Sequence, residues 1–574
     1  MIRNLVSLAV AVIVGFAASP LIPMVLGAHN PWLVPAASVL AGLGGGVVFG
    51  LGWWCMVEFG AVPFLTVATE IVLLSTVAFL VLAFGGTLSW TWTAFSLLTG
   101  AALVLWAVKT IVQGRISWVK TPLNLLLVLL LAYFLFQLLP LPAAVLNVFQ
   151  SNTAKAFQYG PPNVPAVAAL KTTDSRSVPI SLNRTETRDH IFLWTGYLAF
   201  FFVFINSITR RQQLGRMLAV VLVAAAVTAV AGFATAKQDE RLLYRQYSVA
   251  GANDRSPVLN ADVPREFSAG YGFQVPTVEG DTVDWYVPKV HTGDVFGGFP
   301  SSSSAGTVLV MGLLLSLGCL FAYTATYREE WARSGGLLFT REGNLTLMLG
   351  FLALVSAAGL VMTRNRGALG VALFCVAALI VWVAFSRSRR AGILAVVVLA
   401  IVFAVPYFLA GHVRAAAGPQ IDSFLNPFGE ELRMQARQGS WGIIGDFPMF
   451  GTGLGTYGDV YPAYKVRGPD LYFAHCDLLQ WWAETGLVGM ALGAAILGVL
   501  AWTVIAGYRK LKDRFFRRLL IATSVAAVAF LLNGLFDFPM QIPGVMILFM
   551  TLLGATVIIS RDQIARYERD DFLY

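Results

Sequence analysis

Uninterrupted apolar runs, each about the length of a membrane span, dominate this sequence. A helix crosses the ~30 Å hydrocarbon core of a bilayer with about 20 apolar residues. The runs do not alternate between apolar and polar residues, as the strands of a membrane barrel do. We therefore predict an all-α polytopic membrane protein with about 14 transmembrane helices. The predicted spans are 5–27, 33–56, 60–83, 91–112, 122–140, 190–208, 216–236, 304–325, 344–362, 367–386, 391–410, 484–506, 518–536 and 541–560.

The composition excludes most classes of soluble protein. Charged residues make up 12% of the 574 residues and apolar residues 57%, whereas a soluble chain carries about 25% charge. A cytosolic enzyme, a disordered chain and a nucleic-acid binder are all excluded. The four cysteines include no C-x-x-C pair, so neither a disulfide framework nor a zinc site is indicated. Further spans follow the first at once, which favours a signal-anchor helix over a cleaved leader.

The short loops predict how the chain lies in the membrane. With the N-terminus in the cytoplasm, the inner short loops hold clusters of Lys and Arg, whereas the outer loops 28–32, 84–90 and 537–540 hold none. This is the positive-inside pattern, with both termini cytoplasmic. The predicted organisation is 1–140 (helices 1–5), 141–189 (outer loop), 190–236 (helices 6–7), 237–303 (outer loop), 304–410 (helices 8–11), 411–483 (outer loop), 484–560 (helices 12–14) and 561–574 (cytoplasmic tail).

One outer connection breaks the charge pattern. Between the ninth and tenth predicted spans the chain carries Arg364 and Arg366 on the side where basic residues are disfavoured. Two interpretations remain open: the side chains reach outer-leaflet phosphates, or a guanidinium binds an anionic ligand at the interface. Arginine suits the second task because its planar fork binds two phosphate oxygens and keeps its charge.

The outer loop 411–483 supplies matching chemistry. It contains Arg437, a glycine run ending at Gly455, and His475 on a predicted short amphipathic helix before the next span. The glycine run is more typical of a turn than of a phosphate cradle, because it lacks the Lys-Ser/Thr of a P-loop. Among the five histidines, His475 is the best candidate for a general base.

The order and spacing of four blocks resemble the O-antigen ligase / Wzy-type polymerase family over about residues 345–500. Two segments further upstream, 139–142 and 179–182, look like the leading portion of longer, exopolysaccharide-type members. The chain has Asn365 where many relatives have Ser, and Cys476 where many have Asn. The four blocks are Arg366-Gly367, Arg437-x-x-x-Trp441, Pro448-x-x-Gly-x-Gly-x-Gly455 and Ala474-His475-x-x-Leu478-Leu479-x-x-x-x-Glu484-Thr-Gly486.

The resemblance implies a glycosyltransferase of the GT-C type in surface polysaccharide assembly. The donor would be a glycan on undecaprenyl diphosphate, at the periplasmic face of the bacterial inner membrane, and the acceptor a glycan or lipid A–core. By the same resemblance, Arg366 and Arg437 would bind the diphosphate, and His475 would be the catalytic base. The reaction would invert the anomeric carbon without a metal or other cofactor. Other polysaccharide export components are expected partners, and nucleic acid is not.

Secondary candidates surround these three residues. Arg364 and Arg433 are further phosphate contacts, although Arg433 has Glu430 and Glu431 as alternative partners. Asp477 or Glu484 would orient His475, or would instead face solvent or cap the following helix. The three tyrosines that could stack on sugar, or belong to the membrane interface, are Tyr457, Tyr461 and Tyr472.

Two other classes of protein remain open. A transporter or flippase would account for Glu70, a carboxylate inside a predicted span. A structural assembly protein would not need Arg366. Within the enzyme class, a ligase and a polymerase share the donor and differ in acceptor. The long outer segments 141–189 and 237–303 favour the polymerase slightly.

Overall fold

The computed structural model describes residues 60–114, 118–153, 156, 177–235, 275–279, 282–286, 296–333, 338, 340–401, 431–465 and 471–562. Ten helices in this part are long and apolar enough to cross a membrane. They confirm an all-α, multi-pass membrane protein. The ten are α4 (Ala61–Leu82), α5 (Ser89–Val112), α10 (Arg184–Ser207), α11 (Arg211–Thr235), α13 (Ser302–Arg333), α14 (Arg341–Met362), α15 (Arg366–Arg387), α20 (Asp477–Lys510), α21 (Arg514–Asn533) and α22 (Pro543–Ser560).

Four of the fourteen predicted spans are not among these ten helices. The spans 5–27 and 33–56 lie outside the described residues. Of the span 391–410, the structure describes a helix only as far as residue 401. The span 122–140 is a shorter helix, α6 (Pro122–Phe136), whose 15 residues reach about 22 Å at 1.5 Å per residue. The total of fourteen and the GT-C architecture stay predictions.

Helix α22 forms the centre of the described bundle. In its most apolar stretch 94% of the residues are buried, compared with 11% in α20 and 22% in α5. A helix that is apolar all round belongs in a protein interior, while the exposed apolar faces of α5 and α20 suit contact with lipid. Small residues let the inner helices approach closely: a Cβ added to Gly312 of α13 would lie 2.2 Å from that of Ala225 in α11.

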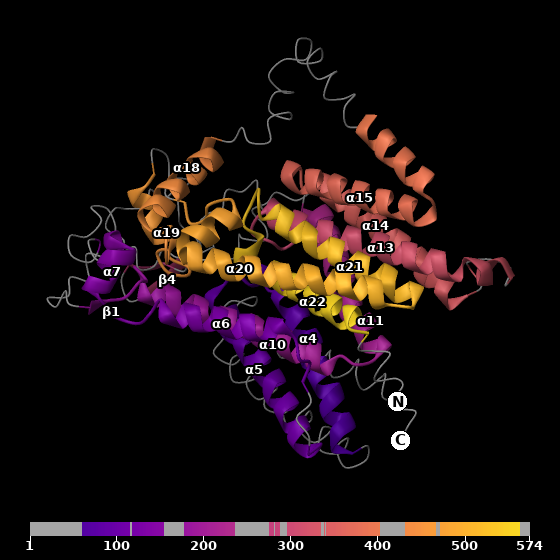
Figure 1. Cartoon of the computed structure of the whole chain (residues 1–574), viewed down its shortest axis with the longest axis horizontal. Helices are drawn as coiled ribbons and strands as arrows, with labels where there is room; N and C mark the ends of the chain where they lie inside the picture. The colour runs from indigo at the N-terminus through magenta and orange to yellow at the C-terminus, as the bar shows by residue number, and fades with distance from the viewer. Residues whose placement is uncertain are drawn as a thin grey trace, which may run out of the picture.

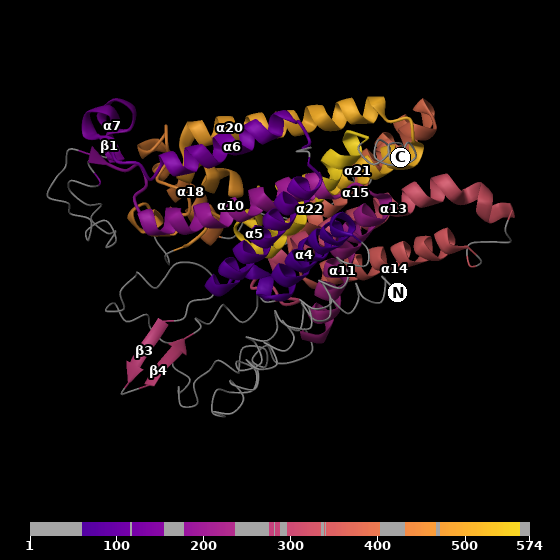
Figure 2. The ribbon, with the colours of Figure 1, turned by 90° about the horizontal axis from the view of Figure 1, so that it is seen from below.

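Helices α7 (Ala143–Phe149) and α18 (Glu431–Asp446), which lie outside the spans, are at the same end of the bundle, as Figures 1 and 2 show. The charge pattern predicts that this end faces outward. Strand β1 (Leu141–Pro142) pairs antiparallel with β2 (Ser177–Val178), so the two upstream segments that resemble exopolysaccharide-type members lie side by side. The other elements outside the spans are η1 (Phe84–Gly86), the hairpin of β3 (Val275–Glu279) and β4 (Thr282–Tyr286), α19 (Tyr457–Val460), η5 (Tyr461–Ala463) and η6 (Pro539–Gln541).

Helix α20 is broken at Gly486, near this outer end. Gly486 has φ 60° and ψ −164°, a backbone conformation that is essentially restricted to glycine. The break separates a short segment, residues 477–485, from the long apolar segment that follows. The short helix predicted before the span is therefore present, but the prediction that His475 lies on it is wrong, because the helix begins at Asp477 and His475 has φ 50°.

Residues 448–455, which we call the glycine loop, replace the helical hydrogen bonds lost at this break. Two amides of α20 donate to the loop, and two loop amides donate to α20. The bonds are Leu487 N to Pro448 O (2.8 Å), Val488 N to Met449 O (3.2 Å), Thr452 N to Ala483 O (3.0 Å) and Gly453 N to Glu484 O (3.0 Å). The glycine run is thus a turn that completes a helix, as expected from its lack of a P-loop lysine.

Helix α6 adds side chains to the same junction. The hydroxyl of Tyr133 donates to the carbonyl of Thr485 (2.6 Å), and the amide of Gln137 donates to the carbonyl of Glu484 (3.0 Å). Buried carbonyl groups left without a donor destabilise a fold by about 1–3 kcal/mol each. These bonds therefore fix the break in one geometry.

We expect Gly486→Ala to lower the melting temperature of the purified protein strongly. A Cβ at residue 486 would lie 2.4 Å from the carbonyl carbon of Met449, in a conformation unsuited to alanine. Gly498→Ala is the matched control, because it lies in the same helix with no atom within 4 Å of an added Cβ. The control is expected to keep or gain stability, by about 0.5–1 kcal/mol. Equal melting temperatures for both variants in detergent would contradict this role of Gly486.

Candidate functional site

The connection between α21 and α22 brings together three segments that are far apart in the sequence. Helix α21 ends at Asn533, and the chain turns through residues 534–538 before η6 begins. We call these five residues the 534–538 turn. Successive residues of this turn contact the start of α15, helix α18 and the segment that precedes α20.

The start of α15 packs on this turn. The side chain of Asn365 caps the helix by accepting a hydrogen bond from the amide of Ala368 (2.8 Å). Arg366 is therefore the first helical residue, and it is exposed. A Cβ added to Gly367 would lie 3.4 Å from the Cβ of Phe536. This contact fixes the backbone next to Arg366 against the turn.

Arg437 reaches the neighbouring residue of the turn from helix α18. Its Nη2 donates to the carbonyl of Leu535 (3.1 Å). Gly367, which follows Arg366, and the side chain of Arg437 therefore adjoin Phe536 and Leu535, which are consecutive in the chain. The long-range fold, and not local sequence, brings the start of α15 and helix α18 to the same turn.

His475 lies on the next residues of the same turn. Its Nδ1 is 3.4 Å from an oxygen of the Asp537 carboxylate, and its ring packs edge-on against Phe538 with centroids 5.0 Å apart. The backbone of His475 has φ 50°, a left-handed conformation that is uncommon for residues other than glycine. Strained backbone of this kind often occurs at functional sites. The imidazole is 22% exposed, so a ligand can reach it.

Asp537 is the functional candidate that sequence reasoning missed. Asp537 follows a predicted span and belongs to no motif. The only sequence feature that could have indicated it is its position in an outer loop without Lys or Arg. The Asp537 side chain is 8% exposed. A buried carboxylate at Nδ1 orients an imidazole and favours a proton on that nitrogen, which leaves Nε2 to accept one.

Asp477 and Glu484, each predicted as a possible partner of His475, bind other groups. The Asp477 carboxylate accepts from the amide of Met540 (2.9 Å), and the amide of Asp477 donates to the carbonyl of Gly534 (2.7 Å). Asp477 therefore joins the 534–538 turn to the start of α20. Its carboxylate is 7% exposed and binds Met540, so the alternative of a solvated carboxylate is wrong, and no bond of this carboxylate caps α20 in the described residues.

Glu484 belongs to the junction of α20 with the glycine loop. One of its carboxylate oxygens accepts from the amide of Gly455 (2.9 Å), and the other accepts from the side-chain amide of Gln480 (3.0 Å). Glu484 is 2% exposed, so the alternative of a solvated carboxylate is wrong. Its role in the structure is to hold the loop on the helix.

Tyr457 is also buried, in contrast to the prediction that it stacks on sugar. Its ring is 1% exposed, and its hydroxyl donates to the carbonyl of Ala436 (3.1 Å) and bonds the Ser440 hydroxyl (3.0 Å). Tyr457 therefore positions α18, and with it Arg437, on the glycine loop. Tyr461 is likewise buried, whereas Tyr472 is 38% exposed and remains available to a ligand.

The other secondary candidates lie near the arginines they were predicted to assist. Arg364 is exposed and has φ 52° in the turn between α14 and α15. Arg433 is on α18, one helical turn before Arg437. Cys476, next to His475, has a thiol whose pKa is raised by burial, so it stays neutral beside the imidazole.

This arrangement combines anion binding with proton transfer. The two guanidinium groups can bind phosphate oxygens in bidentate fashion, and the paired imidazole can take a proton from a nearby hydroxyl. Among the described residues, the groups that do this come from α15, α18, the loop before α20 and the 534–538 turn.

Comparison with known proteins finds a family match for one segment of the chain. Residues 351–494 match the model of a family described as O-antigen ligase. The matched segment contains Arg366, Arg437 and His475, and it ends before Asp537. No curated protein matches this chain.

We expect Glu484→Ala to lower the melting temperature because it removes the acceptor of two buried donors. Each unsatisfied donor costs about 1–3 kcal/mol. Glu484→Gln retains one acceptor oxygen and is expected to lie between the alanine variant and the parent protein. A thermal melt of the three purified proteins in detergent checks this order. An unchanged melt for Glu484→Ala would show that the glycine loop is held without this carboxylate.

Proposed function

Because this membrane protein carries an O-antigen ligase family domain at residues 351–494, we propose that it is an inverting glycosyltransferase of surface polysaccharide assembly. It transfers a glycan from undecaprenyl diphosphate to an acceptor hydroxyl at the periplasmic face of the bacterial inner membrane. The observation that carries the proposal is that the start of α15, next to Arg366, meets Arg437 and His475 at the 534–538 turn.

Arg366 and Arg437 bind the diphosphate in this mechanism. Cleavage of the glycosidic bond leaves negative charge on the departing diphosphate oxygen. Fixed guanidinium groups stabilise that charge more in the transition state than in the ground state, which is the condition for catalysis. The charge of these side chains takes the place of a metal ion.

His475 activates the acceptor. With Nδ1 facing Asp537, the free Nε2 takes the proton of the incoming hydroxyl as its oxygen attacks the anomeric carbon. Asp537 stabilises the imidazolium that forms. Because the hydroxyl attacks opposite to the departing diphosphate in a single displacement, the anomeric configuration inverts.

We expect substitution of each of these residues to reduce glycan transfer in proteoliposomes supplied with lipid-diphosphate donor and chelator. His475→Ala should lose about 10²–10⁴-fold in rate, and Arg366→Ala or Arg437→Ala about 10²–10³-fold. Asp537→Asn should lower kcat with little change in the donor KM, because Asp537 acts through His475. Arg387→Ala, at the opposite end of α15 from Arg366, is the matched control and should stay active.

The products of the same assay separate the two kinds of enzyme. A ladder of lengthening glycans is the result expected of a polymerase, which the long outer segments favour. Transfer of a single finished glycan to lipid A–core indicates a ligase. Full activity of the His475→Ala and Arg366→Ala variants would overturn the proposed mechanism.

The transporter alternative rested on Glu70, and the structure pairs this carboxylate within the bundle. Glu70 of α4 is 5% exposed and forms a bidentate ion pair with Arg216 of α11, with Nη2 2.8 Å from Oε2. Gln213 also donates to Oε2 (3.1 Å). A carboxylate held by two partners on one helix joins α4 to α11, which favours a structural role over proton or ion transport.

We expect Glu70→Ala to lower the melting temperature, because it leaves the buried side-chain amide of Gln213, and Arg216, whose side chain is 48% exposed, without their acceptor. Glu70→Gln retains hydrogen bonding, and its glycan transfer per folded molecule should match the parent protein. The measurement is transfer rate normalised to folded protein, together with movement of lipid-linked glycan across the bilayer. The transporter would be the correct class if the parent protein moved lipid-linked glycan across the bilayer without transferring it, and if Glu70→Gln abolished that movement.

A further inference from the structure

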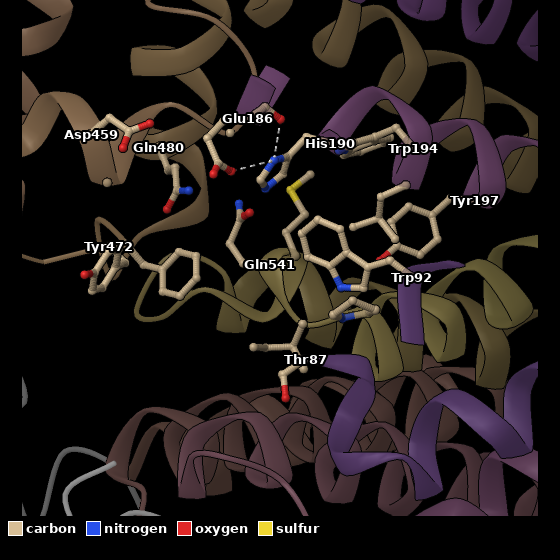
Figure 3. Close-up of a pocket in the computed structure, with 17 residues that line it drawn as sticks. Thr87, Trp92, Glu186, His190, Trp194, Tyr197, Asp459, Tyr472, Gln480 and Gln541 are labelled. Carbon is tan, nitrogen blue, oxygen red and sulfur yellow. Dashed lines mark hydrogen bonds and ion pairs between the residues drawn. The ribbon is translucent and has the colours of Figure 1, made fainter. Parts of the chain in front are cut away.

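A pocket lies near the 534–538 turn, and Figure 3 shows the side chains that line it. Its walls come from the starts of α5 and α10, from Gly455–Asp459, from Tyr472–Phe473 and from Met540–Pro543. Two of these segments flank the candidate active site. Tyr472–Phe473 immediately precedes the loop that carries His475, and Met540–Gln541 follows Asp537. The pocket is therefore next to the proposed base.

Two carboxyl groups, those of Glu186 and Asp459, line the pocket. Asn183, which caps α10, accepts from the backbone amide of Glu186 (3.3 Å) and donates to the carboxylate of Asp459 (2.8 Å), so it holds the Asp459 side chain. The Glu186 carboxylate lies 3.8 Å from Nδ1 of His190. Burial raises the pKa of Asp459. Gln541 adds an amide group to the lining, while the amide of Gln480 binds Glu484.

Aromatic rings form the remaining wall. The indole N–H of Trp92 donates to the carbonyl of Gly86 (3.0 Å), so its polar atom is engaged while the ring lines the pocket. His190 packs edge-on against Trp92, with centroids 5.3 Å apart. Tyr472, which is 38% exposed, lies across from Trp92 in Figure 3. Rings of this kind provide a rigid apolar surface.

The pocket lacks the cationic groups of the arginine side of the site. Its described lining contains no Lys or Arg. Burial, with Asp459 and Asp189 nearby, raises the pKa of Glu186 to about 8, so this carboxyl group is largely neutral at pH 7. A diphosphate is attracted to Arg366 and Arg437 and has no Lys or Arg to bind in the described lining of this pocket. A neutral molecule with many hydroxyl groups can form hydrogen bonds with the carboxyl and amide groups of the pocket. Its C–H faces can pack against the aromatic rings.

We propose that this pocket binds a neutral sugar residue of the acceptor glycan and presents its hydroxyl to His475. The inference rests on the proposed glycosyltransferase function and names the acceptor side of that site. Glu186 and Asp459 accept hydrogen bonds from sugar hydroxyls, and Trp92 with Tyr472 contacts the ring. In this proposal the arginines bind the diphosphate of the donor, and the pocket binds the acceptor.

The test measures binding without turnover. The full chain in nanodiscs, with no donor present, is titrated calorimetrically with the delipidated repeat-unit glycan released by mild acid from the producing cells. Glu186→Gln and Asp459→Asn keep the shape of the pocket and each replace one carboxyl group with an amide. Both are expected to weaken glycan binding at least tenfold. Asp189→Asn is the matched control, since Asp189 lies on the same helix end and its side chain is 50% exposed, in an ion pair with Arg188.

The outcomes of this test separate the two proposals. If the parent protein transfers glycan and the two pocket variants bind it as well as Asp189→Asn does, the pocket assignment is wrong and the enzyme assignment stands. Glycan binding that depends on Glu186 and Asp459, in a protein that never transfers glycan from the lipid donor, would support the pocket and overturn the proposed function. Absence of glycan binding by the parent protein overturns the pocket assignment.

Among turnover measurements, the acceptor KM reports on the pocket and the donor KM on the arginines. We expect Asp459→Asn to raise the acceptor KM at least tenfold while the donor KM stays unchanged. Arg437→Ala should raise the donor KM while the acceptor KM stays unchanged. An equal rise of both constants in Asp459→Asn would indicate general disruption of the site and would contradict a specific acceptor pocket.

Discussion

The break in helix α20 at Gly486 is the constraint on which the outer end of this protein depends. A continuous helix would satisfy its own backbone and leave the glycine loop without partners. Because α20 is broken, its free amides and carbonyls bind the loop, and the side chains of Tyr133 and Gln137 complete the junction. The loop in turn supports Tyr457 and the helix that carries Arg437. A single backbone conformation thus positions segments far apart in the chain.

The 534–538 turn is the second feature that brings distant segments of the chain together. Its successive residues contact the start of α15, the guanidinium of Arg437 and the imidazole of His475. Met540–Pro543, which follow this turn, line a pocket together with carboxyl groups and aromatic rings. The arrangement suits the proposed reaction, in which an anionic group departs and a neutral hydroxyl attacks, because the arginines attract the anionic group.

Sequence analysis predicted the elements far better than the contacts. Ten of the expected spans are helices of the described residues, since an apolar run of this length has few other stable forms. The principal candidates Arg366, Arg437 and His475 were proposed from the order of the four sequence blocks and from basic residues that break the positive-inside pattern. Asp537 was missed because a lone carboxylate after a span has no pattern. The roles of Glu484 and Tyr457 were misread because burial is not visible in local sequence.

The sequence by itself determined that the chain crosses a membrane, the order of its helices and the residue types able to bind a diphosphate. These follow from local properties: length of apolar run, position of charge and choice of side chain. Only the tertiary structure decided which carboxylate faces His475, which glutamate holds the glycine loop and where a pocket opens. Those features depend on contacts between residues separated by tens to hundreds of positions, and such contacts are set by packing of the whole bundle.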